Sequence, residues 1–247
     1  ARQSAGSSAG VGKQDREWGE LEMTATVGFS RTTLGKKAVM AVTGLILFGF
    51  VFIHMFGNLK LYQGETKFDH YAEALRELGK PILGYGQALW IARAVLLAAV
   101  LLHIWSAWSL TLQSWRARPV RYQSHELLQS SYAVRTMRWG GVILLLFVIY
   151  HLAHLTLGSV HPDFVPGKVY QNVVVGFQVG WVAAFYIVAN IALGFHLFHG
   201  LWSFFQTLGW NQPAWNPWRR RFATLFAIVV TLGNVSFPIA VLTGVVR

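Results

Sequence analysis

The chain of 247 residues contains no cysteine. This absence excludes disulfides, thiolate metal sites and the cysteine ligands of iron–sulfur clusters, so any redox centre in the chain must use histidine or methionine. Charge is also scarce, because Asp, Glu, Lys and Arg make up only 13% of the residues, against about 25% in a typical soluble domain. Hydrophobic residues make up 54%. We therefore expect much of the surface to face lipid.

Acidic residues are absent from five long hydrophobic runs, and all ten Asp and Glu lie outside them. Each run reaches the roughly 20 apolar residues that a helix needs to cross a bilayer. The predicted fold is therefore an all-α bundle of five transmembrane helices, over residues 33–57, 88–114, 137–158, 178–208 and 222–245. Residues 29–247 form this bundle, and the polar segment 1–28 is predicted to be a flexible cytoplasmic tail rather than a signal peptide.

The basic residues are distributed unevenly between the two ends of the spans. The end that carries the tail, the 115–136 loop and the 209–221 loop has 14 Lys and Arg against 5 acids, whereas the other end has 6 against 5. Basic residues concentrate on the cytoplasmic side, so we expect the N-terminus inside and the C-terminus outside. The net charge of +11 then follows from topology, and nucleic acid is not expected as a partner.

Two further patterns fit this topology. The 58–87 loop places apolar residues at helical spacing, among them Phe68, Tyr71 and Leu75, which predicts a short interfacial helix on the outer face. Trp210, Trp215 and Trp218 lie at the inner edge of the last two spans, where an aromatic belt is expected.

Four of the spans carry a histidine deep inside: His54, His103, His151 and His196. An ionisable ring in lipid is costly and indicates a function. At about 1.5 Å per residue, His103 and His196 lie some 16–18 Å from the inner edge, and His54 and His151 lie further outward. A haem needs both axial nitrogens at one level. The depths therefore predict two haems, the proximal one held by His103 and His196 and the distal one by His54 and His151.

The third and fourth spans each carry a second histidine three residues on, His154 and His199. Residues at i and i+3 lie on adjoining faces of a helix, so only one of each doublet can point at an iron. The other can bond a propionate, a neighbouring carbonyl or a water. The spacing alone leaves the choice within each doublet open.

A run in the fourth span carries a family resemblance. His196 opens the pattern H-x-x-x-G-L-W-S-F, which resembles the fourth-span motif of the cytochrome b558 membrane anchor of bacterial succinate dehydrogenase. The segments Arg138-Trp-Gly-Gly and Phe147-Val-Ile-Tyr-His151 resemble the third span of that family. His54-x-x-x-Asn58 resembles the end of its first span, and His103 stands where the second-span ligand is expected. The resemblance covers roughly residues 30–245 and selects His196 over His199 and His151 over His154.

The resemblance implies a dihaem, single-chain anchor in a bacterial cytoplasmic membrane. It implies two haem b groups, and as partners an iron–sulfur subunit and a flavoprotein subunit that oxidises succinate. Electrons would pass to membrane quinone, often menaquinone in this family, so this chain would carry quinone chemistry but no catalytic residue for succinate. A higher oligomer of the complex is compatible with this reading.

Several polar residues near the span ends are candidates for secondary roles. Arg93 enters the second span from the outer side, where it can pair with distal haem propionates or simply extend to the interface. Arg31 and Arg138 can serve the proximal propionates from the inner edge, and His154 and His199 are further candidates for bonds to a propionate or to a neighbouring polar group. By position, the candidates for an inner quinone pocket are Ser30, Arg31, Trp202 and Ser203.

Three alternative functions remain at this stage. Fumarate reduction is the same chemistry in the opposite direction. Dihaem anchors of hydrogenases or formate dehydrogenases are also helical and rich in histidine. A haem-free transporter, whose histidines bind a metal or shuttle protons, belongs to a different class. An optical spectrum of the reduced protein separates that transporter from the cytochromes.

Overall fold

The computed structural model describes residues 32–117, 129–210 and 212–247, and the side chains of residues 129–136 are outside this description. Five helices are long and apolar enough to cross a membrane, and the described part of the chain contains no strand. The prediction of an all-α, five-helix bundle is therefore confirmed. The spanning helices are α2 (Thr33–Asn58), α4 (Gln87–Arg116), α5 (Gln129–His151), α7 (Gly180–Thr207) and α8 (Asn216–Leu242). The predicted tail, residues 1–28, lies outside the described residues.

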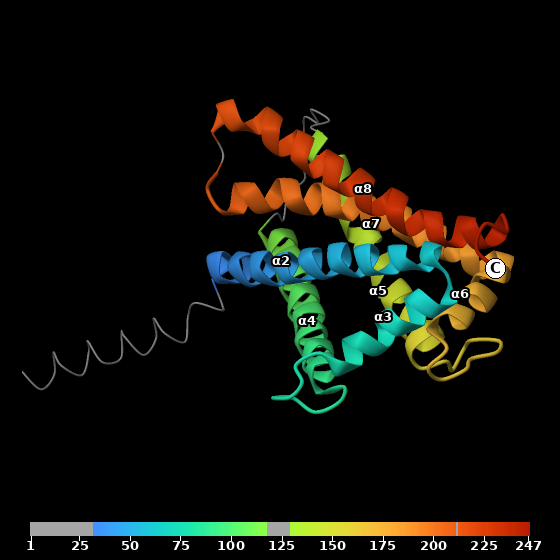
Figure 1. Cartoon of the computed structure of the whole chain (residues 1–247). Helices are drawn as coiled ribbons and strands as arrows, with labels where there is room; N and C mark the ends of the chain where they lie inside the picture. The colour runs from blue at the N-terminus through green and yellow to red at the C-terminus, as the bar shows by residue number, and fades with distance from the viewer. Residues whose placement is uncertain (1–31, 118–128, 211) are drawn as a thin grey trace, which may run out of the picture.

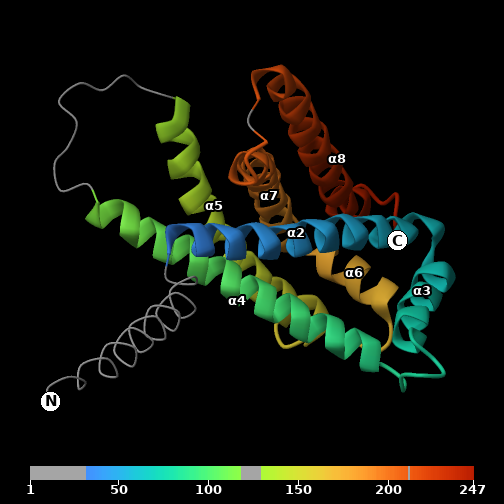
Figure 2. The same ribbon diagram turned by 90° about the vertical axis from the view of Figure 1, so that its left-hand side faces the viewer.

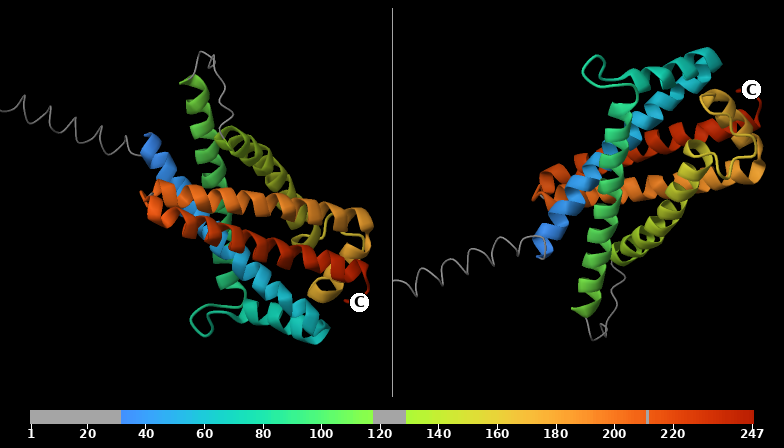
Figure 3. Two further views of the ribbon diagram at one scale, coloured as in Figure 1. Left: turned by 90° about the horizontal axis from the view of Figure 1, so that it is seen from above. Right: turned by 90° about the horizontal axis from the view of Figure 1, so that it is seen from below.

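The helices pack as neighbours in a definite order. α7 lies beside α8 along most of its length (Figures 1 and 3), α2 packs on α4, and α5 packs on α7. α2 makes smaller contacts with α7 and α8 and so joins the two groups. α4 crosses α2 at a steep angle in Figure 1, and α5 stands steeply to α2 in Figure 2.

Short elements gather at the end of the bundle where α2 and α8 finish. A 3₁₀ helix (Leu59–Gln63) leads into α3 (Glu65–Glu77), and α6 (Val169–Gln178) precedes α7. α3 is the helix that the apolar spacing of the 58–87 loop predicts. Hydropathy places most of α6 in a loop, but it packs on α3, α7 and α8, and its Val174 and Phe177 side chains are buried. A π-helical turn, Leu152–Thr156, continues α5.

The fifth span starts earlier than hydropathy predicts. A 3₁₀ turn (Pro213–Trp215) leads directly into α8 at Asn216 rather than at residue 222. Pro217 stands in the first turn of the helix, where its missing N–H costs nothing and its fixed φ favours helix. Three arginines follow in this turn and the next, and their polarity hides the start of the helix from a hydropathy profile.

Burial differs between the two halves of the bundle. The main core lies between α6, α7 and α8 at one end and includes Phe177, Val182, Tyr186 and Phe237. A smaller cluster of Met55, Leu197, Ala227 and Val230 joins α2 to α7 and α8. α2, α4 and α5 instead expose most of their apolar side chains. This is the pattern expected for helices that face lipid or a bound hydrophobic cofactor.

Candidate functional site

The four deep histidines meet in two pairs. The rings of His54 on α2 and His151 at the end of α5 have centroids 6.0 Å apart and planes at 81°. The rings of His103 on α4 and His196 on α7 have centroids 6.3 Å apart and planes at 64°. These are the pairs that depth counting predicts. Each pair joins one helix of the packed α2–α4 couple to one helix of the packed α5–α7 couple.

The separation within each pair fits a metal between the rings. Two imidazoles on opposite sides of a metal, each nitrogen about 2 Å from it, hold their ring centroids about 6 Å apart. Both observed separations have this size. Among the described residues no group of three or more His, Asp or Glu forms a metal cluster. Two side chains per centre suit a haem, whose own four nitrogens complete the coordination.

We call His103 and His196 the inner pair and His54 and His151 the outer pair, after their expected depths. In the inner pair, His103 has the hydrogen bond that is typical of a metal-binding histidine. Thr43 is buried, and its hydroxyl donates to the Val39 carbonyl at 2.7 Å. That hydroxyl lies 3.2 Å from Nδ1 of His103. A hydroxyl has one proton, so here the Thr43 oxygen accepts from Nδ1–H, which leaves Nε2 with a lone pair for a metal. On the other side of the pair, the buried Nδ1 of His196 has no hydrogen-bond partner among the described residues.

In the outer pair, His151 is within hydrogen-bond distance of a tyrosine. The hydroxyl of Tyr186 on α7 lies 3.2 Å from Nδ1 of His151 and 3.0 Å from Nδ1 of His154. Tyr186 is only 4% exposed, and its ring contacts both imidazoles edge to face. Phe147 and Phe177 also contact the Tyr186 ring in edge-type arrangements. The Tyr186 hydroxyl therefore holds Nδ1 of His151, which leaves Nε2 as the nitrogen that can bind a metal.

The structure also separates the members of the first doublet. His154 is fully buried, lies within the π-helical turn and stacks on His161 with ring centroids 4.9 Å apart. A π-helical turn advances the chain differently from an α-helix, so His154 points at α6 while His151 points at His54. Gly176 on α6 leaves the space that His154 occupies, since a Cβ there would lie 2.6 Å from the ring.

The second doublet is resolved by its ring contacts. His196 faces His103, whereas the only ring contact of His199 within the described part of the chain is with Phe198, its neighbour in sequence. His199 is half-buried. The geometry thus favours His196 over His199 as the inner-pair member.

The structure adds three residues to the site that the sequence analysis does not name. Thr43 and Tyr186 support the two pairs, and His161 stacks behind His154. Nε2 of His161 donates to the Asn172 carbonyl at 2.8 Å, and Nδ1 accepts from the Asp163 backbone at 3.1 Å. His161 is the one sequence signal that was visible, as a third histidine near the same span end.

The candidate propionate arginines lie at the bundle surface. Arg93 is exposed, and its guanidinium lies over the Trp90 ring at 4.8 Å. Arg138 is exposed and lies over the Trp115 ring at 5.4 Å, which links α5 to the end of α4. Neither contacts a paired histidine in these positions. Arg31, like Ser30, lies outside the described residues.

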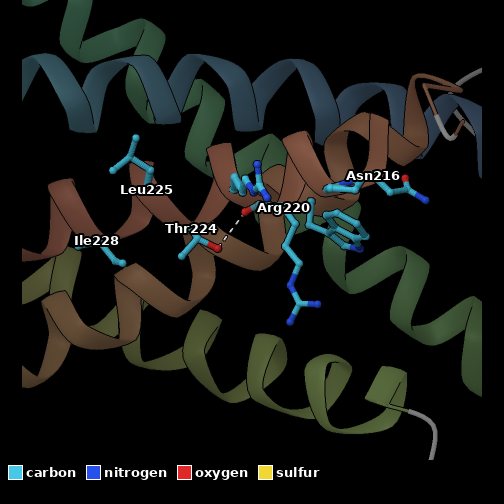
Figure 4. Close-up of a pocket in the computed structure, with 8 residues that line it drawn as sticks. Asn216, Arg220, Thr224, Leu225 and Ile228 are labelled. Atoms are coloured by element: carbon cyan, nitrogen blue, oxygen red, sulfur yellow. Dashed lines mark hydrogen bonds between the residues drawn. The ribbon is translucent and has the colours of Figure 1, made fainter. Parts of the chain in front are cut away.

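A pocket of about 650 Å³ lies where α7 ends and α8 begins. Of the two predicted quinone-site residues on α7, Trp202 lines this pocket, whereas Ser203 is exposed and does not. Figure 4 shows Arg220 and Asn216 at its polar part and Leu225 and Ile228 at its apolar part. The remaining lining residues are Pro217, Arg221 and Thr224.

Comparison with known proteins gives one family. Residues 116–235 match the model for the succinate dehydrogenase/fumarate reductase transmembrane subunit. No curated protein and no solved structure matches the chain. The matched segment holds one member of each histidine pair, His151 and His196. The matched residues include α5, α6, α7 and most of α8, and this part of the chain is similar to the succinate dehydrogenase/fumarate reductase transmembrane-subunit family.

Proposed function

We propose that this chain is the dihaem cytochrome b anchor of a succinate dehydrogenase and passes electrons from an iron–sulfur subunit to membrane quinone. The single observation that carries the proposal is the pair of opposed imidazole couples, each with the ring separation that an intervening iron requires. The family match supports a membrane anchor in a complex that interconverts succinate and fumarate.

Each histidine in this proposal has a defined task. His103 and His196 hold the inner haem, and His54 and His151 hold the outer one. When bound in this way, a haem with two histidine ligands supplies one-electron transfer without an open position for oxygen. The surrounding helices half-bury His103, His151 and His196. Thr43 and Tyr186 fix the second nitrogen of one ligand at each centre. Such contacts orient a ligand and strengthen its bond to the metal.

The inner end of the bundle offers a surface for the iron–sulfur subunit. Its described exposed basic side chains are Lys37, Arg116, Arg138, Arg220 and Arg221, and no described acid accompanies them. A surface of one sign speeds the approach of a partner of the opposite sign. An acidic face on the soluble partner would therefore dock here, at the end of the bundle nearer to the His103–His196 pair.

Quinone binding is proposed for the pocket next to Trp202. Trp202 lies six residues beyond His196 on α7, or about 9 Å along the helix. The Arg220 and Asn216 side chains can donate hydrogen bonds to quinone carbonyls, and Leu225 and Ile228 suit its isoprenoid chain. Menaquinone is the quinone that the family resemblance suggests.

The function is tested by spectroscopy on the purified chain with its partners. We expect a sharp b-type band after reduction and two haems per chain. Separate replacement of His54, His103, His151 or His196 by Ala should remove or loosen one haem, with matching losses within each pair. His154→Ala and His199→Ala are the matched controls and should keep both haems.

Two outcomes would contradict the assignment. A reduced protein without a b-type band would support a haem-free transporter instead. Loss of haem from His154→Ala but not from His151→Ala would reverse the choice within that doublet. Succinate oxidation and fumarate reduction, measured with the same preparation, give the physiological direction.

The quinone site is tested by Trp202→Leu. Loss of the indole should raise the KM for quinone several-fold, because an aromatic wall of the pocket is removed. Haem content and the rate at which succinate reduces the haems should stay unchanged. Ser203→Ala, one residue away and outside the pocket, is the control. An unchanged KM in Trp202→Leu would place the quinone elsewhere.

A further inference from the structure

One phenol proton is shared among two imidazoles at the outer pair. The Tyr186 hydroxyl is within hydrogen-bond distance of Nδ1 of both His151 and His154. A hydroxyl donates once. Tyr186 therefore donates to one of these nitrogens and accepts from a protonated nitrogen of the other.

Metal binding by His151 decides the direction of both bonds. A histidine that binds iron through Nε2 carries its proton on Nδ1 and donates it. The Tyr186 oxygen then accepts from His151, and its own proton goes to Nδ1 of His154. His154 is held in place to receive it, because His161 stacks on one face of its ring and Gly176 leaves its space.

We propose that Tyr186 is a positioning residue of the outer haem site, which, backed by His154, holds the His151 ring and increases its electron donation to iron. The proposal rests on the proposed function and extends it to residues outside the ligand set. A phenol that donates to His154 becomes a better acceptor for His151, since hydrogen bonds in a chain polarise one another. A more electron-rich ligand stabilises oxidised iron, so Tyr186 lowers the midpoint potential of the outer haem.

The chain of bonds tunes the ligand and does not conduct protons. It ends at His151, whose Nε2 would bind the haem iron and so could not pass a proton on. Nε2 of His154, at the opposite end, is buried without a hydrogen-bond partner among the described residues. His161 contacts that ring by stacking, with both of its own nitrogens bonded to backbone groups.

The inner pair provides a built-in comparison. Thr43 accepts from His103 as Tyr186 accepts from His151, but the Thr43 proton goes to a carbonyl of its own helix. The two supports lie on different helices and serve different pairs. Removal of each hydroxyl should therefore affect one haem and leave the other unchanged.

The test compares Tyr186→Phe with Thr43→Val in the complete complex. Tyr186→Phe loses one oxygen and keeps the ring contacts. We expect two haems per chain and an upward shift of one component in an optical redox titration. The midpoint potential of that component should rise by ~59 mV, which is a tenfold change in the one-electron equilibrium constant between oxidised and reduced haem. Thr43→Val should move only the other component.

A second readout reports the orientation of the ring. The electron paramagnetic resonance signal of oxidised low-spin haem depends on the angle between its two imidazole planes, which is 81° at the outer pair. Tyr186→Phe should shift or broaden the signal of one haem only. His154→Phe keeps the stacking on His161 but removes the acceptor, so it should move the same redox component in the same direction by a smaller factor.

Unchanged potentials in a Tyr186→Phe protein that retains two haems would overturn the inference, as would equal shifts of both haems. If Tyr186→Phe does not accumulate with haem, His154→Phe decides in its place. A wild-type complex without haem would instead contradict the proposed function, so the two failures are distinguishable.

Discussion

Gly176 is the residue on which the buried position of His154 depends. A Cβ at this position would lie 2.6 Å from Cε1 and 2.8 Å from Nε2 of His154. The imidazole has no free direction to move, because it is bonded to Tyr186 and stacked on His161. We expect Gly176→Ala to destabilise the protein by about 1–3 kcal/mol through overpacking, seen as a lower midpoint of thermal unfolding in detergent.

Gly180 provides the matched control for this substitution. It lies four residues further along at the start of α7, and a Cβ there has no atom within 4 Å. Gly180→Ala should leave the unfolding midpoint unchanged. Equal destabilisation by the two substitutions would show that the contact with His154 does not set the cost.

The sequence predicts which histidines form the candidate site but not the residues that support them. An ionisable ring in an apolar span is visible without a structure, and depth counting along antiparallel spans predicts the pairing of His103 with His196 that the ring contact also shows. Thr43 and Tyr186 are ordinary residues for an apolar helix and give no such signal. Their contacts depend on how α2 meets α4 and how α5 meets α7, which a single-helix pattern does not contain.

At the scale of helices, hydropathy predicts the five long apolar spans. It misses the polar start of α8 and the short helix α6. The five spans are recovered because each contains a long apolar run. The start of α8 is missed because Arg219, Arg220 and Arg221 lie in its first two turns. Arg219 is buried there, donates to the Trp210 carbonyl, and lies over the Trp202 ring at 5.2 Å.

α6 escapes prediction for a different reason. Its ten residues are too few to span a membrane, so hydropathy alone places most of them in the loop before the fourth span. Asn172 ties the helix to the preceding loop: its side chain accepts from the Val165 N–H and donates to the Val165 carbonyl, each at 2.9 Å. This tertiary anchoring, rather than local propensity, stabilises α6 and brings Gly176 to His154.

At the scale of the whole molecule, the described charges separate by end. All five described acids, Glu65, Asp69, Glu73, Glu77 and Asp163, lie at the end with α3 and α6. The three ion pairs found in the described residues lie there too, for example Glu77 with Lys80 at 2.6 Å. The opposite end carries arginines and lysines without a described acid. This asymmetry predicts that the arginine-rich end is cytoplasmic.

The absence of cysteine makes this orientation directly measurable. Ser159 is exposed beyond the end of α5, and Ala214 is exposed in the turn before α8. A membrane-impermeant maleimide added to intact spheroplasts should label Ser159→Cys, whereas Ala214→Cys should react only after permeabilisation. The unsubstituted chain, which has no thiol, gives the background. Labelling of Ala214→Cys in intact spheroplasts, with Ser159→Cys protected, would invert the topology and place the proposed docking surface on the wrong side for a cytoplasmic iron–sulfur subunit.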